Sequence, residues 1–151
     1  MRGRRKAREI ALQVLYSLNF ANTDAQDALD LFWSNFAAPK TAKEFAALLV
    51  QGTCEHKDEL DKLIAGCSDN WSLGRMSRVD ISILRLAVFE FLYCDDIPPK
   101  VTLNEAVDLG KTFGSENSGS FINGILDALN LKLNKKDATK PLDRKSRPTK
   151  A

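Results

Sequence analysis

The sequence contains few of the residues that usually carry catalysis or hold metals. His56 is the single histidine, and the three cysteines, Cys54, Cys67 and Cys94, lack the C-x-x-C spacing of a zinc or redox site. Cys54 and His56 are two residues apart, and side chains at that spacing on a helix do not face each other. Glycine-rich phosphate loops and H-E-x-x-H motifs are also missing. The sequence therefore predicts reduced thiols, no enzyme activity, no metal site and no cofactor.

Patterns that direct a chain into or across a membrane are missing as well. The N-terminus has no apolar core of a secretory signal, and no apolar run reaches the roughly 18 residues of a membrane span. No stretch alternates apolar and polar residues over the length of a strand. With 151 residues, 44% hydrophobic and 28% charged, the chain is long enough to bury a core. These features predict a cytoplasmic, all-α globular protein.

What the sequence does have is an uneven distribution of charge. Five basic residues precede the first acid, Glu9, and the segment from Lys132 onward has eight basic residues against two acids. Residues 9–131 carry 9 basic and 18 acidic residues, so that their net charge is −9, although the whole chain is +2. A basic edge on an acidic body is typical of a protein that binds a polyanion at one edge only.

The stretch from Ser77 to Tyr93 is predicted to form the central helix. Its apolar residues recur at helical spacing in two adjacent stripes, namely Val79, Ile83, Leu86 and Phe89, and beside them Leu84, Val88 and Phe91. A helix that is apolar around so much of its circumference is covered by its neighbours. Ser77, three residues before Asp80, is predicted to cap the N-terminus of this helix.

Turn and capping signals predict about six or seven helices in total. An amphipathic helix is expected over 4–18, and three S/T-x-x-E/Q capping boxes predict helix starts at Thr23, Thr41 and Thr102. The helix from Thr41 is expected to run to Gly66. Gly52, in the middle of that helix, indicates close packing or a kink.

These helices are predicted to form one domain over residues 1–134, in two sub-bundles of about 1–67 and 68–134. The connector between them contains Trp71 as an anchor. Pro98 and Pro99 force a turn after the central helix. Residues 135–151, rich in lysine, arginine, proline and threonine, are predicted to be a disordered basic tail.

The arginine cluster near the N-terminus indicates nucleic-acid binding. Arginine pairs bidentately with phosphate and stacks on bases, and a helix that presents Arg4, Arg5 and Arg8 can contact successive phosphates. Positive charge at a helix N-terminus opposes the helix dipole, which a bound anion would relieve. Phe121, at the start of the last helix after a polar loop, has two interpretations from the pattern alone: a core residue or a stacking platform for a base.

Four segments together resemble the NusB family of bacterial antitermination factors. They are R-R-K-A-R-E-I-A-L-Q-V-L-Y (4–16), V-D-I-S-I-L-R-L-A-V-F-E-F-L-Y (79–93), D-I-P-P-K-V-T-L-N-E-A-V-D-L-G-K-T-F-G-S-E-N-S (96–118) and F-I-N-G-I-L-D (121–127). They occur in the family's order and spacing over residues 4–130.

The resemblance implies an all-helical fold of two three-helix bundles that binds boxA, a single-stranded RNA element of nascent ribosomal transcripts. It also implies a heterodimer with the ribosomal protein NusE, which joins other Nus factors on RNA polymerase and supports read-through of terminators. By position in the motifs, the implied RNA-binding residues are Arg4, Arg5, Lys6, Arg8, Glu116, Asn117, Ser118 and Phe121. Tyr16 and Asp80 match positions at which the family contacts NusE.

The sequence departs from the family pattern near Phe121. Gly119-Ser120 replaces a polar and basic pair that is common there, and Asn117 replaces an acid. Three other interpretations stay open at this stage. The first is the RNA-binding part of a ribosomal RNA methyltransferase. The second is a helical interaction module that binds no RNA. The third is a homodimer that covers the arginine-rich helix.

Overall fold

The computed structural model describes residues 2–68 and 72–139, which form seven α-helices and one short 3₁₀ helix and contain no strand. The α-helices are α1 (Arg2–Leu18), α2 (Ala25–Asn35), α3 (Lys40–Glu55), α4 (Lys57–Gly66), α5 (Arg78–Tyr93), α6 (Pro99–Phe113) and α7 (Ser118–Thr139), and η1 (Leu73–Arg75) is the 3₁₀ helix. The all-α prediction is confirmed. None of these helices is long and apolar enough to cross a lipid bilayer.

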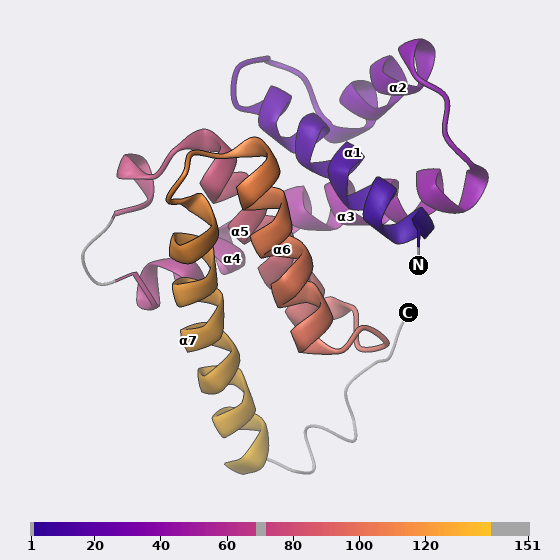
Figure 1. The fold of residues 1–151 in the computed structure, drawn as a ribbon. Helices are drawn as coiled ribbons and strands as arrows, with labels where there is room; N and C mark the ends of the chain where they lie inside the picture. The colour runs from indigo at the N-terminus through magenta and orange to yellow at the C-terminus, as the bar shows by residue number, and fades with distance from the viewer. Residues whose placement is uncertain (1, 69–71, 140–151) are drawn as a thin grey trace.

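The helices pack as two bundles that share one core. In Figure 1, α1, α2 and α3 form one group, and α4, α5, α6 and α7 form the other. α5 belongs to the second bundle but also packs against α1 and α3, so it joins the two. α4 packs against α5 and also contacts α3 and α7. The division into sub-bundles near residue 67 stays a prediction.

α5 is the buried centre that its two apolar stripes predict. Its residues from Asp80 to Leu84 and from Leu86 to Glu90 are all buried. The backbone N–H of Asp80 donates to Ser77 Oγ at 3.0 Å, which confirms the predicted cap. Gly52 of α3 lies directly on Phe89 of α5, where a Cβ atom would stand 2.2 Å from the phenylalanine ring. The close-packing interpretation of Gly52 is therefore confirmed.

The three predicted capping boxes are wrong. α2 is capped by Asp24, whose carboxylate accepts from the N–H of Asp27 at 2.8 Å, and not by Thr23. α3 begins at Lys40, directly after Pro39, with no side-chain cap. α6 begins at Pro99, because proline fits the first position of a helix, and this places Thr102 inside the helix.

Two predicted helix boundaries also shift. The helix expected over 41–66 is interrupted at His56, which ends α3 and precedes α4. Asp58 and Glu59 in the first turn of α4 favour a new helix start there, because acids complement the positive end of a helix dipole. α7 continues to Thr139, past the predicted start of a tail at 135. The remainder of that tail and Trp71 lie outside the described residues.

Candidate nucleic-acid interface

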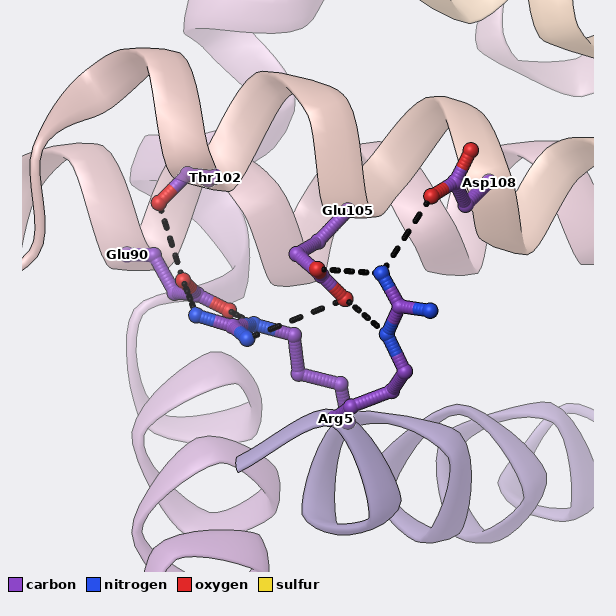
Figure 2. Close-up of polar contacts among 6 residues, drawn as sticks. Arg5, Glu90, Thr102, Glu105 and Asp108 are labelled. Atoms are coloured by element: carbon purple, nitrogen blue, oxygen red, sulfur yellow. Dashed lines mark hydrogen bonds and ion pairs between the residues drawn. The ribbon is translucent and has the colours of Figure 1, made fainter. Parts of the chain in front are cut away.

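The arginines at the start of α1 lie against carboxylates of the second bundle. Arg4 Nη2 is 3.1 Å from Asp96 Oδ2, in the turn between α5 and α6. Arg5 makes a bidentate pair with Glu105 of α6, at 3.2 Å from Nε and 2.8 Å from Nη2, and its Nη2 lies 3.5 Å from Asp108 (Figure 2). The Arg5 side chain is 59% exposed and that of Arg4 34%. Both guanidinium groups are therefore paired but accessible.

Arg8 is different, because it is 4% exposed and belongs to the core. Its Nε and Nη2 donate to the two oxygens of Glu90 at 2.8 and 2.9 Å, and Thr102 Oγ1 donates to Glu90 Oε1 at 2.9 Å. Figure 2 shows this network beside the Arg5 pairs. Burial opposes the charged form of Arg8, but the hydrogen bond and charge of Glu90 raise its pKa above the ordinary value. The prediction that Arg8 is presented on the surface with Arg4 is wrong, because a guanidinium so enclosed cannot reach a phosphate.

Phe45 of α3 gives the arginines an aromatic support. The Arg4 guanidinium carbon lies 4.6 Å from the centroid of the Phe45 ring, and that of Arg8 lies 5.6 Å from it. A cation over a ring face is attracted by the ring quadrupole. Phe45 and the carboxylates thus hold the N-terminal turns of α1 against both bundles.

Two exposed lysines, one on α1 and one on α6, have no carboxylate within ion-pairing distance among the described residues. Lys6 lies on α1, one residue after Arg5, and Lys111 lies in the last turn of α6. Lys6 is among the RNA-binding residues predicted from the sequence, and Lys111 is not. The available signal was spacing, since Lys111 follows Asp108 by three residues and therefore shares its face of the helix.

The corner between α6 and α7 is built on close contacts at glycine. A Cβ atom on Gly110 would lie 2.7 Å from Ile122 Cδ1, and one on Gly114 would lie 2.3 Å from Ser118 Oγ. Ser118 is 1% exposed, and its Oγ accepts from the N–H of Ser115 at 2.9 Å. Its side chain therefore holds the corner and is not available to RNA, contrary to the prediction. Glu116 and Asn117 are exposed at the tip of the corner.

Phe121 lies in the first turn of α7, where its side chain is partly buried and packs against the core. Its backbone N–H donates to the carbonyl of Asn117 at 3.1 Å. Partial burial is compatible with both interpretations of the sequence, a core residue and a stacking platform. A role in stacking stays a prediction.

The two residues predicted to contact a protein partner lie at the other end of α1 and at the start of α5. Tyr16 is 38% exposed, and its ring packs edge-on against that of Phe20, which is 67% exposed, at 5.1 Å between centroids. Asp80 is only 9% exposed, and its Oδ1 has no hydrogen-bond partner among the described residues. The sequence analysis missed Phe20, whose position in a turn after a helix carries no pattern.

The described residues contain no group of three histidine, cysteine or acidic side chains that could hold a metal ion. His56 stacks on Tyr93 at 4.3 Å between ring centroids, and the Tyr93 hydroxyl donates to Glu59 at 2.6 Å. Burial and this carboxylate raise the pKa of Tyr93 to about 12. Cys54 is exposed as a residue, but partial burial of its thiol raises the pKa of that group above the ordinary value. A thiol with a raised pKa is a poorer nucleophile at neutral pH.

Comparison with known proteins assigns these features to one family. A model described as the NusB family matches residues 5–130. Transcription antitermination protein NusB of Syntrophus aciditrophicus (strain SB) is 62% identical over 137 residues, covering 91% of this chain and 85% of that protein. The protein of the same description from Geobacter sulfurreducens is 49% identical over 130 residues, covering 85% and 94%.

Solved structures agree with the sequence comparison. The T. maritima NusB structure superposes with a TM-score of 0.76 at 38% identity, covering 83% of this chain and 89% of that one. A crystal structure of the antitermination factors NusB and NusE in complex with dsRNA has a TM-score of 0.76 at 30% identity, covering 85% and 96%. The fold is thus shared along most of both chains, and this chain belongs to the NusB family.

Proposed function

We propose that this protein is a non-enzymatic transcription antitermination factor of the cytoplasm that binds boxA RNA of nascent ribosomal transcripts together with NusE. In this role it acts with other Nus factors to support read-through by RNA polymerase. The observation that carries the proposal is the basic start of α1, where Arg5 and Lys6 are exposed beside the acidic body of residues 9–131. The crystal structure of a relative in complex with NusE and dsRNA supports the proposal that NusE and RNA are partners of this protein.

The proposed RNA face consists of Arg4, Arg5 and Lys6 on α1 and of Glu116, Asn117 and Phe121 at the corner of α6 and α7. Arg5 is 59% exposed, and the carboxylates of Asp96 and Asp108 are exposed, whereas that of Glu105 is 18% exposed. Ion pairs that are open to solvent are worth only about 0–1 kcal/mol. A polyanion can therefore replace them, releasing counterions from the RNA as it binds. Arg8 has a different task, because its buried pair with Glu90 fixes α1 in the orientation that presents its neighbours.

Phe121 is proposed to stack on a base at the far end of this face. Single-stranded RNA is recognised by stacking of unpaired bases on aromatic rings and by contacts to their edges. Glu116 and Asn117 precede Phe121 in the sequence and are exposed. Their carboxylate and amide groups can form hydrogen bonds with the edges of bases. The replacement of an acid by Asn117 lowers the repulsion of phosphates at this end.

NusE is proposed to bind around Tyr16 and Asp80. An exposed aromatic pair such as Tyr16 and Phe20 is the kind of anchor that dominates protein interfaces. Asp80 is 9% exposed, and it matches a position at which the family resemblance implies contact with NusE. A basic ribosomal protein also suits the acidic body of residues 9–131.

The test compares binding of single-stranded boxA RNA, a scrambled strand and a boxA duplex, each with and without NusE. We expect NusE to increase affinity and boxA to bind more tightly than the scrambled strand. Equal affinity for boxA and scrambled RNA in the presence of NusE would contradict the proposal. Preference for the duplex would retain RNA binding but exclude stacking on unpaired bases.

Two substitutions separate charge from stacking on the RNA face. Arg5→Ala should weaken all single strands alike and flatten the log–log salt dependence by about 0.7, the contribution of one phosphate contact. Phe121→Ala should weaken binding by about 1–3 kcal/mol and leave the slope nearly unchanged. Because Phe121 also packs on the core, its variant is compared per folded molecule. Unchanged affinity of the folded fraction would show that Phe121 is a core residue only.

A further inference from the structure

The ion pairs of α1 raise the question of which cations an RNA strand meets first. Arg4 faces Asp96, Arg5 faces Glu105 and Asp108, and each guanidinium must exchange a carboxylate for a phosphate. Lys6 and Lys111 have no such competitor within ion-pairing distance among residues 2–68 and 72–139. Lys6 lies on α1 beside the arginines, whereas Lys111 lies on a different helix.

Lys111 lies in the last turn of α6, beside the start of α7. It follows Asp108 by one turn of α6, and Asp108 is the residue that Arg5 reaches from α1. At its other side, Lys111 passes over the first turn of α7. A Cβ atom on Gly119 would lie 3.1 Å from Lys111 Cγ and 3.4 Å from its Cε. Lys111 thus lies one turn of α6 after the residue that Arg5 reaches, and against the helix that carries Phe121.

The contact with Gly119 also restricts where the ammonium group can go. Most of the Lys111 stem lies along the backbone of α7, so fewer rotamers remain to be lost when the ammonium group binds a ligand. A bulkier residue at position 119 would push this stem away. Gly119 departs from the polar side chain common in the family, and in this protein its small size admits a cation from α6 to the same place.

The electrostatics favour an anion at this position. Lys111 lies near the N-terminal turn of α7, where the positive end of the helix dipole adds to its potential. Asp108 is the nearest acid along α6, and it is already paired with Arg5. Within the described residues, the ammonium group of Lys111 forms no ion pair. Packing against Gly119 involves only the aliphatic part of the side chain, so it does not account for the charge.

We infer that Lys111 binds a phosphate of the RNA strand and links the arginines of α1 to the base held by Phe121. This inference rests on the proposed RNA-binding function and adds a residue to it. The ligand is a phosphodiester between the nucleotides that these two ends bind. The RNA path then crosses α6, so that the strand contacts both bundles.

The experiment measures binding of single-stranded boxA RNA to the full chain between 0.1 and 0.5 M salt. Lys111→Met keeps the length of the aliphatic stem and removes only the charge. Lys111→Arg keeps the charge, and Lys62→Met removes a matched exposed lysine from α4. Thermal melts of all four proteins establish that the stem contact with Gly119 is retained.

One lost phosphate contact changes the log–log slope by about 0.7, which corresponds to a roughly five-fold weaker affinity at 0.1 M salt and about two-fold at 0.3 M. We expect this loss for Lys111→Met, and wild-type behaviour for Lys111→Arg and Lys62→Met. A Lys111→Met protein with the wild-type slope and affinity overturns the inference while the wild-type protein still binds boxA. If the wild-type protein does not bind boxA, the proposed function fails first. A loss that is equal at all salt concentrations, or one that Lys62→Met shares, also overturns it.

Discussion

At the scale of the residue, Arg4, Arg5 and Arg8 of α1 show how differently identical side chains can be used within two turns of one helix. Arg5 is more than half exposed and its ion pairs are screened by solvent, whereas Arg8 is enclosed and donates to both oxygens of Glu90. The first arrangement can be exchanged for a ligand, and the second cannot. Two predictions follow from this difference.

Glu90→Gln should destabilise the protein by about 3–5 kcal/mol, because it leaves the Arg8 charge buried without its counter-charge. The loss is measured as the change in the free energy of unfolding in denaturant. Glu44→Gln, an exposed acid on α3, is the control and should change stability by no more than about 0.5 kcal/mol. If the two variants unfold at the same denaturant concentration, the Arg8–Glu90 pair does not hold α1 in place.

Asp108→Asn should bind RNA more tightly than the wild type, by roughly two- to five-fold, because it removes one competitor of the phosphate for Arg5. Asp127→Asn on α7 removes the same charge from an exposed position and is the matched control. Affinities measured at low salt should separate the two variants, and the difference should shrink as salt increases. Equal gains in both variants would mean that only the net charge matters.

At the scale of the element, the packing of helices on one another depends on a few positions without side chains. Gly52 admits Phe89 between α3 and α5, and Gly110 admits Ile122 between α6 and α7. By contrast, a Cβ atom on Gly124, at an exposed position of α7, would meet no atom within 4 Å. The chain therefore offers a matched pair of helical glycines, one packed and one open.

Gly52→Ala should destabilise the protein by about 1–3 kcal/mol, because the ring of Phe89 must move to admit the methyl group. Gly124→Ala should stabilise it by about 0.4–1 kcal/mol, since alanine restricts the unfolded chain and favours the helix. Equilibrium unfolding measures the change in the free energy of unfolding for both variants, and this change should have opposite signs for the same chemical substitution. A stabilised Gly52→Ala protein would show that α3 and α5 are not in close contact.

The helices themselves were largely predictable from sequence, and their contacts were not. The stripes of α5 and its Ser77 cap are local patterns, and both are confirmed by the structure. The capping boxes failed because the S/T-x-x-E/Q pattern also occurs inside helices, as at Thr102, whose hydroxyl binds Glu90 instead of a free N–H. The burial of Arg8 was invisible, because its partner lies 82 residues away.

At the scale of the whole molecule, the two proposed partners are separated along α1. The arginines at its start belong to the RNA face, whereas Tyr16 and Phe20 lie at or beyond its end. A helix of this length spans about 25 Å at 1.5 Å per residue. One helix can therefore contact a basic protein at one end and a polyanion at the other, without the two ligands competing for the same side chains.

Tyr16→Ala should weaken NusE binding by more than about 1 kcal/mol, as expected for an aromatic anchor, and should leave the salt dependence of RNA binding unchanged. Phe36→Ala, which changes the exposed aromatic residue at the C-cap of α2, is the control and should bind NusE normally. Titration calorimetry with NusE measures both. Wild-type affinity of Tyr16→Ala would remove Tyr16 from the interface.

The buried pair between Arg8 and Glu90 also has a consequence for synthesis on the ribosome. The two residues are 82 positions apart, and at about 5–20 residues per second the carboxylate is made some 4–16 s after the arginine. During that interval α1 has been translated, but the counter-charge that seats it does not yet exist. The nascent chain therefore carries the Arg8 charge without its buried counter-charge until α5 has been made, although α3, on which α1 also packs, is translated earlier.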